Sequence, residues 1–463
     1  MLQPISSIRT ITLITTTLSS FLVTFMVSAM TVALPSIGKE FQLNAGLLGW
    51  MMTVYLLATA IFVVPFGKMG DLYGRKRMFL YGLAVYTVAS LLAGFASSAA
   101  FLIGLRIVQG IGAAMIFSNS VAMLTSVFPP QQRGRVLGIN LAATYTGLST
   151  GPLLGGLLTQ YAGWRSIFWV NAVCGGLTLA VVLWQLHDEW AEAHGETFDW
   201  LGSILAGIML LALTVGLQKL PGMRGIIFII VGIATLSIFV WWELRVPHPV
   251  LSMNLFLANR GFAFSNLAAL IHYSATYALS FLLSLYLQYL KNLPPQQAGL
   301  VLIAQPVMMA IFSPWAGRLS DRIESRILAS VGMSVTTIGL VVFTGLQAQT
   351  PIWLIVLNLL FLGAGFAFFS SPNTHAIMSA VERRFYGVAS GTLATMRTTG
   401  QALSMGMVMM VFSLHQINQT QMTPTVYSDF LSSVRTIFGV CGVLCFFGIF
   451  ASLARGKQKD SPA

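Results

Sequence analysis

The chain has 463 residues, of which 56% are hydrophobic and only 8% are charged. Soluble domains carry about 25% charged residues, so this composition excludes a soluble enzyme, a nucleic-acid-binding protein and a disordered scaffold. The net charge of +12 therefore indicates basic cytoplasmic loops of a membrane protein rather than a surface for nucleic acid.

Continuous apolar runs follow one another along the chain and predict an all-α polytopic membrane protein with fourteen transmembrane helices, because each run has about the 20 residues that a spanning helix needs. A β-barrel would instead show alternation over about 10 residues. The approximate bounds of the runs are 10–34, 47–66, 78–96, 99–121, 137–159, 166–186, 200–219, 224–243, 261–290, 296–316, 327–347, 352–374, 387–413 and 431–454.

The distribution of basic residues predicts that the N- and C-termini are both cytoplasmic. With the N-terminus inside, 17 of the 25 lysine and arginine residues fall in inside segments and 6 in outside segments, as the positive-inside rule requires. The loop His187–Asp199 runs against this pattern, because it has five acidic residues and no lysine or arginine on the predicted inside. Acidic residues contribute little to orientation, so the expectation stands.

An internal repeat is visible in two loops. Gly67-Lys-Met-Gly-Asp71 follows the second run, and Gly317-Arg-Leu-Ser-Asp321 follows the tenth, 250 residues later. Eight runs separate the two copies, so a repeat of six helices leaves two helices over. Repeated halves around a midplane site are typical of secondary transporters.

The repeat predicts three parts of the chain. Residues 1–196 form an N-terminal six-helix bundle, residues 197–246 an inserted helix pair, and residues 247–463 a C-terminal six-helix bundle with a short tail.

The Gly67–Arg77 segment is the first candidate for a conformational role. Gly67 and Gly74 allow a tight turn between two helices, and Asp71 is able to accept N–H groups at a helix N-terminus. Arg75 is able to bridge to a carboxylate. We expect this cluster, echoed at Asp321, to stabilise one conformation of the protein; a simple basic anchor loop is the alternative.

Arg106 and Gln109 stand inside the fourth run. A charge inside the membrane costs about 2.5–3.5 kcal/mol on insertion scales and usually has a function. We therefore predict that Arg106 and Gln109 contribute to substrate binding or coupling, with snorkelling of Arg106 to the outer interface as the alternative.

The fifth run carries Gly147, Gly151 and Gly155, four residues apart, together with Pro152. Such glycines form a groove on one helix face, and proline removes one backbone hydrogen bond. The pattern predicts close packing and bending against another helix, with a gating role or packing alone as the two interpretations.

The three motifs resemble those of the major facilitator superfamily, and fourteen runs with a central pair resemble its fourteen-helix drug:proton antiporter family. The likeness extends along nearly the whole chain. It includes Ala33-Leu34-Pro35, Gly163-Trp164-Arg165, Phe198-Asp199-Trp200-Leu201-Gly202, Tyr286-Leu-Gln288 with Gln297-Ala298-Gly299-Leu300, and Gly387-Val-Ala-Ser390-Gly391. The resemblance implies rocker-switch alternating access, drug export in exchange for protons, and docking of Asp71 on the span that begins near Gly387.

The sequence departs from that family in its acidic residues. The position of the acid that the family often has in the first span is Met26 here, and no aspartate or glutamate stands near the centre of any predicted span. The charges inside the runs are Arg106 and Arg397. Arg397 is expected near the midplane, either in binding or coupling or in structural pairing with a partner such as Gln401.

His272 is the only histidine well inside a run, with Tyr273 and Tyr277 nearby on its helix. Histidine titrates near physiological pH and is able to carry a proton. A proton-coupling role for His272 and Tyr277 and a neutral, hydrogen-bonded histidine are equal alternatives.

Together with the resemblance, these patterns predict a monomeric secondary transporter in the inner (plasma) membrane. The resemblance implies that it exports hydrophobic or amphipathic small molecules and that the proton gradient drives this export. The alternatives are a carrier of a defined anionic metabolite that uses Arg106 and Arg397, and a passive facilitator. The motifs of zinc hydrolases, nucleophile elbows and nucleotide sites are absent from the sequence, so no enzyme, cofactor or metal site is expected. The three cysteines lie in apolar runs and predict no disulfide framework.

Overall fold

The computed structural model describes residues 5–186, 188–191, 196–251, 253–320, 322–381, 386–417 and 426–456. The regular elements in these segments are helical. They are α1 (Ile5–Glu40), α2 (Ala45–Tyr73), α3 (Arg75–Ala93), α4 (Ala99–Val127), α5 (Pro130–Ala162), α6 (Arg165–Gln185), α7 (Trp200–Lys219), α8 (Met223–Glu243), α9 (Met253–Ala258), α10 (Arg260–Thr276), α11 (Ala278–Leu285), the π-helical turn η1 (Tyr286–Leu290), α12 (Pro295–Leu302), α13 (Ala304–Leu319), α14 (Ser325–Thr344), α15 (Ile352–Ser379), α16 (Tyr386–Leu414) and α17 (Tyr427–Leu453).

Capping side chains fix the starts of several helices. The Asn44 side chain accepts a hydrogen bond from the Leu47 N–H at 2.8 Å, and the Asp199 side chain accepts one from the Gly202 N–H at 2.8 Å. Each bond satisfies a donor that the first turn of a helix leaves without a partner. Asn44 thus begins α2, and Asp199 begins α7.

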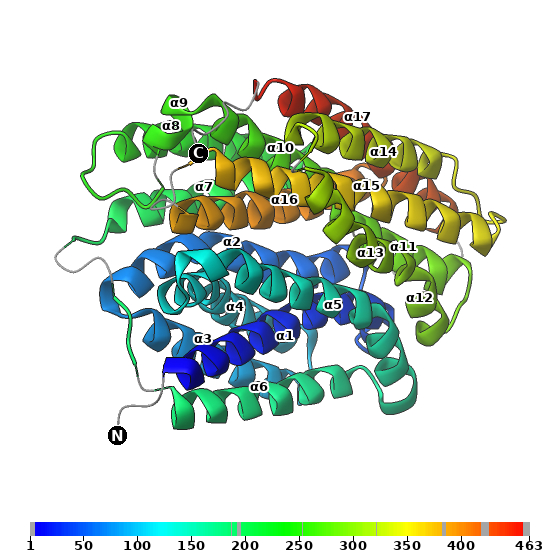
Figure 1. The fold of residues 1–463 in the computed structure, drawn as a ribbon. Helices are drawn as coiled ribbons and strands as arrows, with labels where there is room; N and C mark the ends of the chain where they lie inside the picture. The colour runs from blue at the N-terminus through cyan, green and yellow to red at the C-terminus, as the bar shows by residue number, and fades with distance from the viewer. Residues whose placement is uncertain are drawn as a thin grey trace.

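The helices form two bundles that lie side by side. Figure 1 shows α1 to α6 in one bundle and α10 to α17 in the other. Helix α7 packs on α8 and also contacts α2 of the first bundle and α16 of the second. We call α7 and α8 the inserted pair. The exact boundaries after residues 196 and 246 stay predictions.

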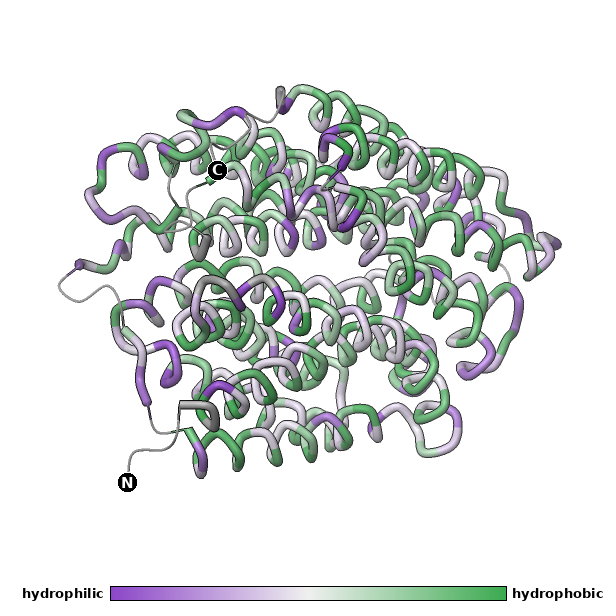
Figure 2. The backbone as a smooth tube through the Cα atoms, in the orientation of Figure 1, coloured by the Kyte–Doolittle hydropathy of each residue, from purple (hydrophilic) through white to green (hydrophobic). Residues whose placement is uncertain are grey.

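Eleven of the described helical segments are long and apolar enough to cross a membrane by length and composition. Helices α3, α5 and α16 are not among the eleven, so the count of fourteen stays a prediction. Figure 2 shows hydrophobic residues along the helices of both bundles and hydrophilic residues concentrated in the connections. The chain is therefore a multi-pass membrane protein.

The internal repeat seen in the sequence is also visible in two helix crossings, one in each bundle. A Cβ on Gly82 of α3 would lie 3.0 Å from the Gly112 carbonyl oxygen of α4. A Cβ on Gly332 of α14 would lie 2.7 Å from the Gly365 carbonyl oxygen of α15. Gly332 stands 250 residues after Gly82, the offset between Gly67 and Gly317. The third and fourth helices of each bundle therefore pack through the same glycine contact.

Candidate functional site

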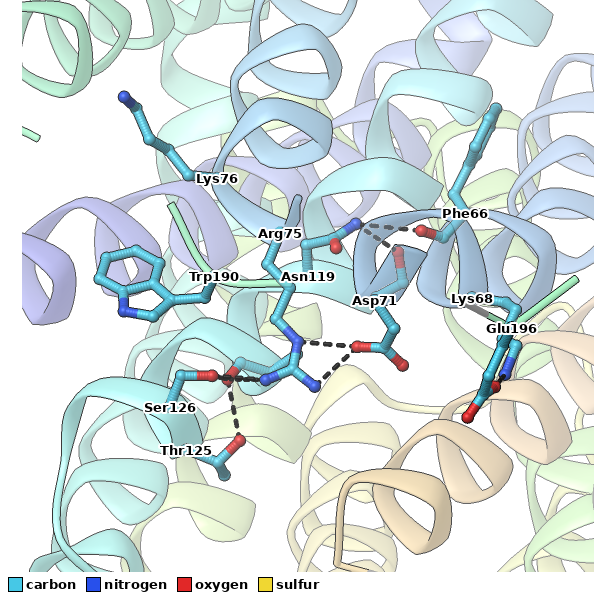
Figure 3. Close-up of polar contacts among 12 residues, drawn as sticks. Phe66, Lys68, Asp71, Arg75, Lys76, Asn119, Thr125, Ser126, Trp190 and Glu196 are labelled. Carbon is cyan, nitrogen blue, oxygen red and sulfur yellow. Dashed lines mark hydrogen bonds and ion pairs between the residues drawn. The ribbon is translucent and has the colours of Figure 1, made fainter. Parts of the chain in front are cut away.

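Arg75 is the centre of a polar cluster where α2 joins α3, which we call the Asp71 end of the molecule (Figure 3). Its guanidinium group forms an ion pair with Asp71, with Nη2 2.6 Å and Nε 2.7 Å from Oδ1. The same group donates hydrogen bonds to the Ser126 hydroxyl and, at 3.4 Å, to the Ala122 carbonyl of α4. The Arg75 residue is only 8% exposed. One side chain therefore holds the ends of α2, α3 and α4 together.

Gly74 makes the turn between α2 and α3 possible. Its φ is 116°, a backbone conformation that glycine adopts readily and other residues avoid. A Cβ at this position would also lie 2.5 Å from the Glu189 carboxyl carbon. The close approach of Glu189 to this turn thus requires the absence of a side chain.

The acidic loop between α6 and α7, which does not follow the positive-inside rule, runs across the Asp71 end. We call its described residues, 188–191 and 196–199, the acidic strap. Glu189 accepts hydrogen bonds from the N–H groups of Lys76 and Arg77 at 2.9 and 3.2 Å, and Glu196 forms an ion pair with Lys68. The hydrogen bond from Lys68 lowers the pKa of Glu196. Two acids of this loop, Glu189 and Glu196, therefore pair with groups at the end of α2 and the start of α3.

The backbone of the acidic strap contributes as well. The Arg75 N–H donates to the Trp190 carbonyl at 2.8 Å. This contact fixes the first residue of α3, whose N–H has no partner within the helix.

The second copy of the motif is described in part. Gly317 lies near the end of α13 and faces Ser371 of α15, as Gly67 of α2 faces Ser118 of α4. Asp321 lies outside the described residues. Gly387 is the second residue of α16, but the side-chain surroundings there are also outside the described residues. The docking of Asp71 on the start of α16 therefore stays a prediction.

The glycines of α5 form the expected groove, and α1 fills it. A Cβ on Gly147 would lie 2.6 Å from the Phe21 carbonyl oxygen, one on Gly151 2.5 Å from the Ser28 Cβ, and one on Gly155 2.6 Å from the Ala29 Cβ. Contacts this short exclude any larger residue without a shift of the helices. The groove faces a neighbour within the same bundle.

Pro152 faces the other bundle. A Cβ on Gly299 of α12 would collide with the Pro152 carbonyl oxygen, and one on Gly156 would lie 2.6 Å from the Pro295 carbonyl oxygen. Helices α5 and α12 thus cross at backbone contact. The sequence signal for this crossing is the presence of glycine at both 156 and 299, but the two positions lie too far apart along the chain for spacing alone to connect them.

Hydrogen bonds join the bundles where α1 ends, which we call the Pro35 end. The Ser284 hydroxyl of α11 donates to the Thr31 carbonyl at 2.6 Å, and the Gln288 amide of η1 donates to the Val32 carbonyl at 2.9 Å. Pro35 lies inside α1 and has no N–H, so the Thr31 carbonyl four residues earlier lacks its helical partner. Ser284 supplies that partner from the opposite bundle.

Arg106 is fully buried among aromatic side chains between α4 and α2. Its guanidinium carbon lies 4.1 Å from the centre of the Tyr55 ring, and its Nη1 donates to the Gln109 side chain at 2.5 Å. Gln109 in turn donates to Ser90 of α3 at 2.7 Å. The Nη2 atom has no hydrogen-bond partner among the described residues. Arg106 thus does not snorkel, and one donor remains free.

Arg397 of α16 is partly buried, and its guanidinium carbon lies 5.6 Å from the centre of the Tyr273 ring. Tyr277 lies near enough to interact electrostatically with both Arg397 and Arg106. The Tyr277 hydroxyl is buried and has no hydrogen-bond partner among the described residues. Gln401 lies one turn further along α16 and is partly buried. The structure therefore places the two arginines, one from each bundle, around one tyrosine.

Comparison with known proteins identifies the family of this two-bundle fold. The sequence profile described as Major Facilitator Superfamily matches residues 16–252 and 265–463. The chain belongs to the Major Facilitator Superfamily. A bacterial homologue of the human lysosomal transporter Spinster, solved in an inward-facing and unoccupied conformation, has the same fold, with a TM-score of 0.70 at 17% identity over 100% of both chains.

Two curated relatives of this major facilitator have described substrates or roles. The riboflavin transporter RibZ of Clostridioides difficile (strain 630) is 28% identical and is matched over 97% of this chain and 98% of its own. The multidrug resistance protein Stp of Mycobacterium tuberculosis (strain CDC 1551 / Oshkosh) is 31% identical over 85% of this chain and 74% of its own. The chain is therefore a transporter, as its relatives are.

His272 of this major facilitator packs among aromatic side chains, including Tyr273, whose ring centre lies 6.1 Å from the centre of the His272 ring. Its ring is fully buried, with its centre 3.9 Å from the centre of the Phe369 ring and its Nδ1 4.0 Å from the Cys445 sulfur. These neighbours belong to α15 and α17, within the C-terminal bundle. The structure thus brings Tyr277 together with Arg106 and Arg397, and leaves His272 in an aromatic core.

Proposed function

We propose that this major facilitator exports hydrophobic or amphipathic small molecules from the cytoplasm by proton antiport with rocker-switch alternating access. It acts as a monomer in the plasma membrane, spans it fourteen times and has both termini in the cytoplasm. The Asp71 end then faces the cytoplasm. Similarity to the multidrug resistance protein Stp over 74% of the length of that protein supports export of drug-like compounds.

The observation that carries the proposal is the group of aromatic and guanidinium side chains between the bundles. Arg106 lies over Tyr55, and Arg397 over Tyr273, with Tyr277 near enough to interact electrostatically with both arginines. Aromatic rings accept flat apolar compounds by stacking, and tyrosine hydroxyls supply a polar end for amphipathic ones. Free donors on Arg106 and Tyr277 offer hydrogen bonds to a ligand without disturbing existing pairs.

Contacts between the bundles at the Pro35 end support alternating access. Hydrogen bonds from Ser284 and Gln288 close that end across the bundle interface. A substrate bound between the bundles is released there only after these bonds break, which is the motion that a rocker switch makes.

A second candidate function is a carrier of one defined anionic metabolite. Similarity to a riboflavin transporter over nearly the full length of both chains favours a defined substrate, and two buried arginines favour an anionic group. Arg397→Gln separates the two functions. Loss of anion transport with intact expression favours the metabolite carrier, whereas continued transport of neutral or cationic compounds favours the drug exporter.

The proposed function is tested in everted membrane vesicles with an imposed pH gradient. A pH-sensitive dye reports proton release on addition of cationic, neutral and anionic amphipathic compounds. Proton efflux with one class establishes antiport and identifies the charge type of the substrate. No response to the whole panel, with expression confirmed, contradicts drug:proton antiport and leaves a metabolite carrier or a uniporter.

A further inference from the structure

We propose that Asp199 and Glu243, at the base of the inserted pair, form a carboxyl pair that binds one proton between them. Neither residue stands near the centre of a predicted span, and no motif in the sequence indicates a site there. The pair is a proton-binding site in its own right; its coupling to transport rests on the proposed function.

Both carboxyl groups are buried and each has one oxygen engaged. Asp199 is 7% exposed and Glu243 is 2% exposed. The Asp199 Oδ1 accepts hydrogen bonds from the Gly202 N–H at 2.8 Å and the Trp242 indole N–H at 3.0 Å. The Glu243 Oε2 accepts one from the Leu251 N–H at 3.0 Å. These bonds orient the two carboxyl groups.

The remaining oxygen of each carboxyl group points to one place. Asp199 Oδ2 and Glu243 Oε1 are buried and have no hydrogen-bond partner among the described residues. A Cβ on Gly202 would collide with Asp199 Oδ2 and would lie 2.6 Å from Glu243 Oε1. Both free oxygens therefore flank the same point on Gly202, and only a glycine leaves room for them.

Electrostatics then requires a proton at this point. Two ionised carboxylates that are close and buried repel each other, and neither free oxygen has a donor. One proton from water removes one of the two charges and also supplies an O–H donor from one carboxyl group to the other. Pairs of this kind bind a single proton with an affinity that belongs to the pair.

Charged side chains of the acidic strap and of the segment after α8 have partners other than the carboxyl pair. Glu196 of the acidic strap binds Lys68 of α2 and lies 3.5 Å from the His248 Nδ1 in the segment after α8. Arg245, in that same segment, lies over the Trp241 ring at 4.1 Å. Further charged or titratable side chains on the elements packed against α7 are Tyr55, Asp71 and Tyr73 of α2, Lys219 of α7 itself, Arg224 of α8 and Arg397 of α16.

The position of the pair connects its charge to both bundles. Asp199 caps α7, and α7 contacts α2 and α16. Protonation changes the charge where the start of α7 lies against the end of α8, where the Trp242 indole N–H donates to Asp199. It therefore changes how firmly the inserted pair is held between the bundles. In this proposal, the pair serves as the proton-binding acid of the transporter, because no aspartate or glutamate stands near the centre of a predicted span.

Infrared difference spectroscopy of the full chain in liposomes tests the pair directly. During an alkaline titration from neutral pH, we expect the protonated carboxyl stretch to disappear with the loss of one proton. Asp199→Asn and Glu243→Gln should each lose this band, because the amide donates to the remaining carboxylate and replaces the proton. Glu196→Gln should retain it. Absence of the band in the wild type, or its persistence in both single variants, overturns the pair.

Gel filtration of each variant shows whether it remains folded. If one of Asp199→Asn and Glu243→Gln does not fold, the infrared test uses the other.

Transport measurements then test whether the proton site is coupled to transport. We expect Glu243→Gln to lose proton release on addition of substrate while retaining substrate counterflow. Unchanged proton release in this variant overturns the coupling role and leaves the proton site in place. No proton release in the wild type instead contradicts antiport itself, and the infrared band still decides the pair.

Discussion

Arg75 shows how much of the Asp71 end depends on one side chain, because it contacts Asp71, Ser126 and the backbone of α4 together. A guanidinium group has five donors in a fixed plane and is suited to such multiple contacts. The ion pair with Asp71 is the charged part of this arrangement. Its loss weakens the attachment of α2 to α3 without touching the aromatic site between the bundles.

We therefore expect Asp71→Asn to slow transport by about tenfold, since a charge-assisted hydrogen bond contributes about 1.5–3 kcal/mol, while substrate affinity stays close to that of the wild type. Initial transport rates and ligand-induced quenching of tryptophan fluorescence measure the two quantities. Arg77→Gln is the control, because the Arg77 side chain is 68% exposed. An equal loss of binding and transport in Asp71→Asn would show that Asp71 does not act on conformation alone.

At the residue scale, contacts between residues of one helix can be predicted from their spacing in the sequence. Contacts between residues of different helices cannot. Arg106 and Gln109 stand three apart on α4, so their shared face was predictable, and they bond at 2.5 Å. Tyr55 covers Arg106 from α2, and no spacing along the chain indicates that contact. The strap acids Glu189 and Glu196 were unexplained for the same reason.

At the scale of the elements, hydropathy predicts where helices lie but does not predict where they end or break. The predicted run 200–219 coincides with α7, whereas run 137–159 is only the inner part of α5, Pro130–Ala162. Apolar residues mark the thickness of the hydrocarbon layer, and helices continue beyond it into polar residues. Run 261–290 is divided into α10, α11 and the π-helical turn η1. Hydropathy is continuous across these residues, so it gives no signal for the divisions.

The contact of α5 with α1 gives a prediction with an internal control. Gly151→Leu should abolish transport, because even a Cβ would lie 2.5 Å from the Ser28 Cβ. Gly138→Leu on the same helix should retain it, since nothing lies within 4 Å of a Cβ there. Transport by protein of equal abundance in the membrane measures both. Full activity of Gly151→Leu would mean that the groove is not required to stay tightly packed.

The hydrogen bond between α11 and α1 predicts an interaction between two distant substitutions. Ser284→Ala should favour opening of the Pro35 end, because it leaves the Thr31 carbonyl without a donor, at a cost of about 1–3 kcal/mol. In a Pro35→Ala background the restored N–H satisfies that carbonyl, so Ser284→Ala should then have little effect.

Spin-label distances across the Pro35 end, measured in the wild type, both single variants and the double variant, give the coupling energy. Additive effects would show that Ser284 and Pro35 act independently.

At the scale of the whole molecule, the bundles meet at the Pro35 end, and the proposed rocker-switch motion requires them to separate there. Gln160 of α5 accepts a hydrogen bond from the Gln296 N–H of α12 at 3.3 Å. We expect cysteines at positions 160 and 296, in a chain whose Cys174, Cys441 and Cys445 are replaced, to form a disulfide that stops transport until it is reduced. Each single cysteine variant is the control. Transport that continues with the disulfide formed would contradict opening at this end.

The inserted pair makes the two sides of the molecule unequal. Helix α7 lies against the seam between α2 and α16, whereas the seam where α5 meets α12 and α13 is built without it. A compound dissolved in one leaflet of the bilayer therefore meets one seam lined by additional helices and one lined by the bundles themselves. If the proposed hydrophobic substrates enter from the lipid, the two seams offer them unequal routes toward Arg106 and Arg397, and we expect the seam without the inserted pair to be the more open one.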